Sequence, residues 1–312
     1  MRWIVLKVAY MVPVVLVVTF ITFLLLYILP GDVTVLMLGQ DATQEAVAQT
    51  RTALHLDDPI LVQYWRWLVA ALSGDFGRSH VTGQLVGEAL SERLGVSFQL
   101  MIMAQSFALL LAVPSGILCG YRAGRNVDRL LTGAAFGVVS LPIFIKSMLL
   151  MILFAVFLRW LPSTGYVEFS DDVWGSIHSL ILPALAISLA EWPALMRVLR
   201  SDIITTLQEN FILNARAKGL PPAHILFRHA LRPSCFSIVT VIGLQIAGLV
   251  NGVLIVETIF ALPGLGRLLV EAVHARDVII VQGAVAAIAV IYVVANLGVD
   301  LLYAVIDPRV RR

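Results

Sequence analysis

Long apolar stretches dominate this sequence and decide what the chain can fold into. The first, Val8–Leu29, runs for 22 residues without a charge, and only 13% of the whole chain is charged. That is too little charge to cover a water-soluble domain of this size. About 20 helical residues cross a bilayer core, where only helices and closed barrels satisfy their own backbone. Six segments qualify, and none alternates like a barrel strand: Val8–Leu29, Val96–Tyr121, Leu130–Leu158, Ile177–Met196, Ser234–Val256 and Val278–Leu302. The sequence therefore predicts an all-α integral membrane protein with about six transmembrane helices.

Basic residues are divided unequally between the segments that connect these spans. One group of segments holds 14 Lys/Arg and 4 Asp/Glu, and it comprises residues 1–7, 122–129, 197–233 and 303–312. The other group holds 7 Lys/Arg and 14 Asp/Glu, and it comprises residues 30–95, 159–176 and 257–277. Because cytoplasmic loops are enriched in Lys and Arg, the first group is predicted to lie in the cytoplasm. Both termini are then cytoplasmic.

The longest outer connection, residues 30–95, is predicted to form a small helical cap. Asp41-Ala-Thr-Gln44 resembles a capping box that opens a helix reaching about His55. Asp58-Pro59 fits the N-cap and first position of a second helix, which Gly74 ends.

These elements divide the chain into two expected parts. Residues 1–95 hold the first transmembrane helix and the helical cap, and residues 96–312 hold a five-helix core. Glycines spaced by four residues recur within the spans and would let helix backbones approach closely. The pairs are Gly116/Gly120, Gly133/Gly137 and Gly248/Gly252.

The cytoplasmic segment 197–233 is unusually long, basic and partly apolar. Phe211, Ala215 and Lys218 would share one face of a short helix. Gly219 follows them, and glycine pays no steric penalty in the left-handed conformation that ends many helices. The segment therefore predicts a short helix that ends at Gly219.

Two prolines follow this predicted helix. Pro221-Pro222 forces a turn, and Ala223–Leu231 can form a second short helix. From these residues alone, two interpretations remain open. The segment is either a helix–turn–helix that projects from the membrane or an ordinary solvated loop with the positive charge of the cytoplasmic side.

The same segment also carries a family resemblance. Ala215-Arg-Ala-Lys-Gly-Leu220, followed by Arg228-His-Ala-Leu-Arg-Pro233, resembles the loop that defines permease subunits of binding-protein-dependent ABC importers. That loop usually opens with Glu-Ala-Ala, whereas Asn214-Ala215-Arg216 is the form seen in the dipeptide/oligopeptide/nickel branch. Further stretches resemble that branch in the same order: Gly74–Ser79, Glu257–Phe260, Pro263–Gly266, Arg276-Asp277, Asn296, Asp300–Tyr303 and Asp307–Arg309. The chain thus resembles a first, B-type permease subunit over essentially its whole length.

The resemblance implies a type I ABC importer-like permease fold and a transport subunit that is not an enzyme. In this family the short helix of the loop docks on an ATPase subunit and transmits its power stroke. The residues that the resemblance implicates here are Asn214, Ala215, Arg216, Ala217, Lys218, Gly219 and Leu220. The chain contains no P-loop, so we expect no cofactor in it, and partner subunits would bind ATP and Mg²⁺.

The resemblance also implies partners, a location and a range of cargo. The partners are a second homologous permease subunit in a heterodimer, two ATPase subunits and an extracytoplasmic solute-binding protein, with no nucleic acid. The location is the bacterial inner membrane, crossed several times. The branch carries di- and oligopeptides, nickel and metal chelates, and the sequence does not choose among them.

Two ionisable residues within the spans support a competing interpretation. Lys146 and Glu191 lie in the third and fourth apolar segments, and such groups mark ion paths or proton relays. They are consistent with a secondary transporter or channel driven by an ion gradient, although no inverted repeat is evident. They could also line an aqueous pathway separately or form an interhelical ion pair. A membrane enzyme has less support, because the chain contains neither His-Glu-x-x-His nor Gly-x-Ser-x-Gly.

The predicted topology can be tested with reporter fusions. A reporter that is active only outside the cytoplasm should be active when fused after Ser170 and silent when fused after Gln208, because the division of basic residues places them on opposite sides. Enzyme activity per unit of membrane-inserted fusion is the measurement. The reverse pattern would exclude the six-span topology.

Overall fold

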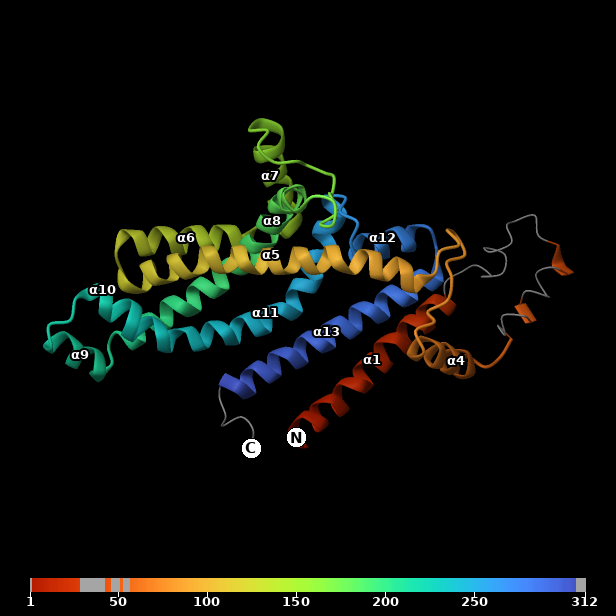
Figure 1. Ribbon diagram of the computed structural model, residues 1–312, viewed down its shortest axis with the longest axis horizontal. Helices are drawn as coiled ribbons and strands as arrows, with labels where there is room; N and C mark the ends of the chain where they lie inside the picture. The colour runs from red at the N-terminus through yellow and green to blue at the C-terminus, as the bar shows by residue number, and fades with distance from the viewer. Residues whose placement is uncertain (1, 29–42, 46–50, 53–56, 307–312) are drawn as a thin grey trace. The chain divides into compact units, whose positions relative to one another are not determined.

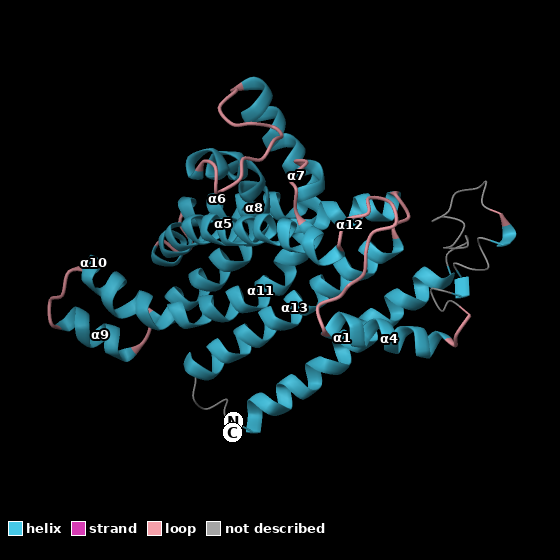
Figure 2. Ribbon diagram, turned by 45° about the vertical axis from the view of Figure 1, so that its right-hand side comes forward, coloured by secondary structure: helices cyan, strands magenta, loops and turns pink. Residues whose placement is uncertain are grey.

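The computed structural model describes residues 2–28, 43–45, 51–52 and 57–306 (Figure 1). By its internal contacts the chain divides into two compact units. Unit 1 comprises Met1–Gly95 and Leu268–Val293, and unit 2 comprises Val96–Arg267 and Val294–Arg312. Throughout the described residues the chain consists of helices and loops, with a single isolated β-bridge between Arg78 and Leu85 (Figure 2).

The helices keep the order of the predicted spans. Unit 1 contains α1 (Arg2–Ile28) and α4 (Ile60–Leu72). Unit 2 contains α6 (Asn126–Ser140), α7 (Ile143–Leu150), η1 (Met151–Phe157), α8 (Val173–Thr206), α9 (Asn210–Ala217), α10 (Pro222–His224), η2 (Ile225–Ala230) and α11 (Leu231–Ile259). Both units share α5 (Val86–Tyr121), α12 (Leu265–His274) and α13 (Val278–Ile306).

Several of these helices are long and apolar enough to cross a membrane. Among the described residues, three helices qualify over Val86–Tyr121, Val173–Thr206 and Val278–Val299. The number rises to five if each bent pair of helices counts as one span. The prediction of an all-α membrane protein is therefore confirmed, while the count of six spans and the side of the termini stay predictions.

The third predicted span, Leu130–Leu158, is not one continuous helix as expected. The chain bends by 106° between α6 and the α7–η1 pair, across a break at Leu141-Pro142. Leu141 has the extended backbone (φ −88°, ψ 130°) that a following proline favours, and Pro142 has no N–H to continue the helix. Apolar length predicted the segment correctly, but the local effect of Pro142 redirects it.

In unit 1, α4 packs on α1 through a buried tyrosine. Tyr64 shares a 2.9 Å hydroxyl contact with Thr19, donates to the Leu16 carbonyl at 3.0 Å, and meets the edges of the Phe20 and Phe23 rings. This aromatic contact fixes the face that α4 presents to α1.

The start of α4 differs by one residue from the prediction. Pro59 occupies the N-cap, and Asp58 pairs with Arg66 at 2.5 Å. The predicted helix from Asp41 to His55 lies largely outside the described residues, as does Asp307–Arg309.

A buried carboxylate joins two distant stretches of unit 1. Ser79 donates to Asp277 across 198 positions of sequence, and the Ser79 hydroxyl accepts from the Thr82 amide at 2.9 Å. Asp277 also accepts from the Ile280 amide and so caps the start of α13. Burial lowers the pKa of the adjacent His80, and the negative charge of Asp277 opposes that shift.

The core of unit 2 depends on close packing of α5 against α8. A Cβ added at Gly116 would lie 2.9 Å from the Leu199 side chain, and one at Gly120 would lie 2.8 Å from Ile203. Leu199 and Ile203 are fully buried. The Gly116/Gly120 pair therefore provides the expected close helix contact, whereas a Cβ at Gly133 would meet no neighbour.

A second buried carboxylate organises the turn that precedes α12. Glu257 is fully buried and accepts from the Ser97 hydroxyl at 2.5 Å and from the Gly266 amide at 2.7 Å. The Ser97 oxygen in turn accepts from the Leu265 amide at 2.9 Å. The negative charge thus lies at the start of α12, where unpaired amides favour it. A Cβ added at Gly264 would lie 2.1–2.3 Å from the Glu257 carboxyl group.

Replacing Gly264 with alanine should destabilise the protein by about 1–3 kcal/mol, because the buried carboxylate has no room to retreat. Thermal unfolding of the purified protein is the measurement. Gly133→Ala is the matched control, since its Cβ meets open space and alanine favours a helix. Equal stability of the two variants would contradict the proposed packing of this turn.

Candidate functional site: the loop after α8

Helix α8 is longer than a membrane span requires. Its 34 residues extend about 50 Å, against about 30 Å for the hydrocarbon core. Hydrogen-bonded turns carry the chain from Thr206 to α9, including the bonds from the Leu207 amide to the Ile203 carbonyl and from the Ile212 amide to the Glu209 carbonyl. α9 is therefore attached to the end of α8 by three ordered residues rather than by a loose loop.

The end of α9 has a Schellman geometry. The Gly219 amide donates to the Arg216 carbonyl at 2.9 Å, and the Leu220 amide donates to the Ala215 carbonyl at 3.3 Å. Gly219 has φ +74°, which confirms the expected left-handed residue after the helix. Leu220 is partly buried against the same apolar cluster that contains Ala215. The predicted helix therefore ends where the sequence indicates.

The two faces of α9 differ in burial. Ile212 and Ala215 are buried against Ile225 and Leu226 of η2, whereas Phe211 is 46% exposed and Leu213 is 52% exposed. Ile212 and Ala215 lie three residues apart and form the buried face of α9, while Phe211 and Lys218 are exposed. The other implicated residues lie at the surface: Asn214, Arg216, Ala217, Lys218 and Gly219.

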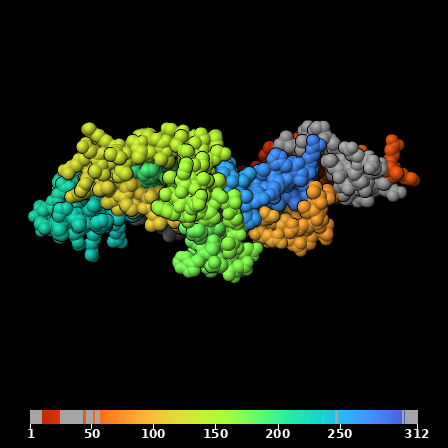
Figure 3. Space-filling view, turned by 90° about the horizontal axis from the view of Figure 1, so that it is seen from above, coloured from red at the N-terminus to blue at the C-terminus, as the bar shows by residue number. Residues whose placement is uncertain are grey.

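The predicted second helix of the loop is present but is not separate. Pro221 occupies an N-cap and Pro222 the first helical position of α10. The backbone then passes through the π-helical segment η2 directly into α11. α9 and α10 lie at the same end of unit 2 as the turn between α5 and α6 (Figures 1 and 3). The loop is therefore a helix–turn–helix, and not an irregular solvated loop.

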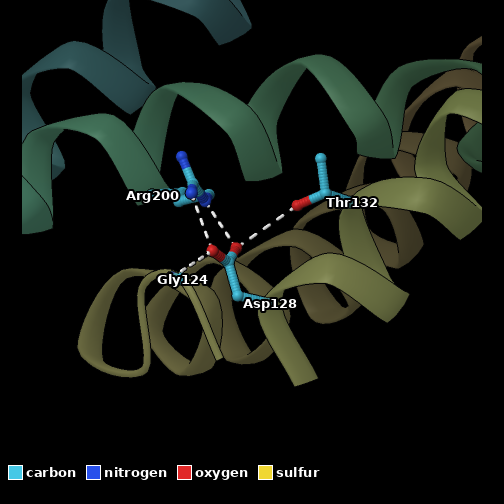
Figure 4. A network of polar contacts seen from close by, with 4 residues as sticks. All are labelled: Gly124, Asp128, Thr132 and Arg200. Atoms are coloured by element: carbon cyan, nitrogen blue, oxygen red, sulfur yellow. Dashed lines mark hydrogen bonds and ion pairs between the residues drawn. The ribbon is translucent and has the colours of Figure 1, made fainter. Parts of the chain in front are cut away.

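An ion pair that the sequence reasoning missed links α6 to the end of α8 (Figure 4). Arg200 donates from Nε to Asp128 Oδ1 at 2.6 Å and from Nη2 to Oδ2 at 2.7 Å. Asp128 also accepts from the Gly124 amide at 2.8 Å and from the Thr132 hydroxyl at 3.3 Å. The available signal was one acidic residue within the short basic loop 122–129.

Lys146 and Glu191 lie on the facing helices α7 and α8. An electrostatic interaction connects them, but in the described residues no ion pair within 4.0 Å joins them. Lys146 is buried, at 6% exposure, and the Gln245 amide of α11 donates to the Glu191 backbone carbonyl at 3.0 Å. Among the described residues, no group of three His, Cys, Asp or Glu side chains could hold a metal ion.

Fold and site together define a class: a multi-pass helical membrane protein that presents a short, ordered helix beyond its spans. Matches to models of known protein families identify its family. Residues 112–312 match the binding-protein-dependent transport system inner membrane component, and residues 1–100 match the N-terminal component of such membrane proteins. The chain belongs to this family of ABC importer permeases.

Named relatives and one solved structure agree with this assignment. The chain is 40% identical to a peptide transport system permease protein of Brucella abortus (strain 2308) over 98% of this chain and 97% of the relative. It is 36% identical to a glutathione transport system permease protein of Salmonella paratyphi A over 96% of both chains. The MetNI methionine ABC transporter in inward-facing form shares the fold, with a TM-score of 0.57, 15% identity, and coverage of 70% of this chain and 96% of that one.

These comparisons establish the role of the chain. It is a permease subunit of an ATP-driven importer in the inner membrane and is not itself an enzyme. A permease of a binding-protein-dependent system works with ATPase subunits and a solute-binding protein. The ion-gradient alternative has no support among these relatives.

Proposed function

We propose that the chain forms half of a translocation pathway for short peptides. The observation that carries this proposal is its 40% identity, over almost the full length, to a protein named as a peptide transport permease. A glutathione permease at 36% identity is consistent with the same chemistry, because glutathione is itself a short peptide. Nickel and metal chelates remain the second candidate cargo from the sequence resemblance.

Ligand binding to the cognate solute-binding protein tests the cargo. Calorimetry with di- and tripeptides, glutathione and nickel chelates should show binding of a peptide and none of the metal complexes. Tight binding of a nickel chelate alone would overturn the peptide proposal without affecting the assignment to an importer.

A second homologous permease subunit should copurify in equal amount with this chain, because one chain supplies only half of the pathway.

We further propose that α9 with its Schellman end docks on an ATPase subunit, which binds ATP and Mg²⁺ in place of this chain. Phe211 and Leu213 expose apolar side chains beside the exposed bases Arg216 and Lys218. Aromatic residues and arginine are enriched at protein interfaces. The buried pair Ile212 and Ala215 holds the helix to unit 2, so a push on the exposed face would reach the membrane helices.

Gly219→Val should abolish copurification of the ATPase subunits while leaving the permease in the membrane. A β-branched residue at φ +74° costs about 1–2 kcal/mol or more and misdirects the end of α9. Gly83→Val is the matched control, because Gly83 has φ +73°, meets nothing within 4 Å and lies far along the chain in residues 30–95. ATPase retention by Gly219→Val would refute the assignment of α9.

We propose that Lys146 and Glu191 act separately and do not form an ion pair, because no contact within 4.0 Å joins their charged groups. Lys146→Leu and Glu191→Leu should then change the thermal stability of the complex additively, within about 0.5 kcal/mol in the double variant. A double variant that is clearly more stable than either single variant would instead reveal an interhelical pair, because each single change would leave one charge unpaired.

A further inference from the structure

We propose that the Asp128–Arg200 ion pair is a positioning contact in energy coupling, which transmits displacement of α9 and α8 to the α5–α6 turn and α6. The proposal rests on the proposed role of α9 as the ATPase contact. Arg200 precedes α9 by only ten positions, and ordered turns fill the interval. The pair therefore lies between the docking helix and the membrane-spanning part of α8.

The geometry of the pair restrains rotation as well as distance. The guanidinium of Arg200 contacts both oxygens of Asp128 in parallel, and a two-point contact holds the two groups in one orientation. The Asp128 side chain is 4% exposed and that of Arg200 is 30% exposed, so water competes weakly at the carboxylate. A rigid, desolvated contact of this kind can transmit motion between the two helices that carry it.

The carboxylate also holds the α5–α6 turn. Asp128 is the third residue of α6, and it accepts from the Gly124 amide one turn earlier and from the Thr132 hydroxyl one turn later. Four donors from three directions thus meet on one side chain (Figure 4). Arg200 therefore binds the same carboxylate, that of Asp128, that stabilises the α5–α6 turn.

Packing alone does not require the ion pair. Leu199 and Ile203 already bury α8 against Gly116 and Gly120 of α5, and these contacts provide close approach without charge. α6 has one other charged contact with α8, in which the Arg197 guanidinium lies 5.6 Å from the Phe136 ring centre. The bidentate pair therefore adds an oriented polar contact between α6 and the end of α8 to the apolar packing of Ala135 in the same cluster as Leu199.

The connection continues toward the pathway. α6 leads through the break at Leu141-Pro142 into α7, which carries the buried Lys146. α7 packs on α8 and α11. A displacement of α6 would therefore also move α7. Docking at α9 would then reach the membrane helices by two routes, through α8 directly and through α6 and α7.

Hydrogen–deuterium exchange of the whole transporter complex tests this proposal without a known cargo. The complex is compared without nucleotide and trapped with ATP and vanadate, in the wild type, Asp128→Asn, Arg200→Gln and the double variant. Arg129→Gln is the matched control, because Arg129 is an exposed basic neighbour of Asp128 on α6. The readout is the difference in deuterium uptake between the two nucleotide states, measured for residues 210–217 and for residues 122–132.

In the wild type and in Arg129→Gln, trapping with ATP and vanadate should change the deuterium uptake of both regions, residues 210–217 and residues 122–132. The single variants should have lower yield, because each leaves one partner of a buried pair without its counter-charge. The double variant should recover the yield and keep the change in residues 210–217, but lose the change in residues 122–132. A double variant with normal yield but no exchange change in residues 122–132 would show that the pair has a positioning role and not only a structural one.

Two outcomes would refute different claims. If residues 122–132 of the double variant still respond to trapping, the ion pair transmits nothing and the inference is wrong. If residues 210–217 respond in no variant, including the wild type, α9 is not the ATPase contact and the proposed function fails. An exchange change in residues 122–132 that persists while α9 is silent would overturn both.

Discussion

The packing of α8 is the constraint on which the rest of unit 2 depends. α8 contacts α6, α7 and α11, and its Leu199 and Ile203 lie against glycines of α5. Lipid tails are as apolar as these side chains, so close backbone approach, and not exclusion from water, holds membrane helices together. Because α8 is fixed in this way and is longer than the hydrocarbon core is thick, it can hold the proposed docking helix α9 in a fixed position.

Polar groups in this protein are placed where they join elements. Asp128 joins α6 to α8, Glu257 joins α5 to the start of α12, and Asp277 joins the Ser79 turn to α13. Each carboxylate is buried and receives several donors. A buried charge is tolerated only when it is satisfied in this way, and the satisfied group then specifies one arrangement of its neighbours.

Local sequence signals predicted the elements of the site well. Apolar length placed the membrane helices, and Gly219 marked the end of α9, because positive φ and helix termination are properties of a few adjacent residues. The errors occurred where a competing local or tertiary effect prevailed. Pro142 broke a segment that apolar length alone would continue, and Pro59 took the N-cap position that the sequence predicted for Asp58.

The sequence by itself determined that this chain is a helical membrane protein, which segments are apolar enough to span, and to which family its loop 197–233 belongs. These properties follow from hydrophobicity, charge and short-range backbone chemistry. Only the tertiary structure decided that Asp128 meets Arg200, that Ser97 meets Glu257, and that residues 268–293 join the same unit as residues 1–95. Such pairings join residues tens to hundreds of positions apart, and they depend on how helices pack rather than on any pattern within one helix.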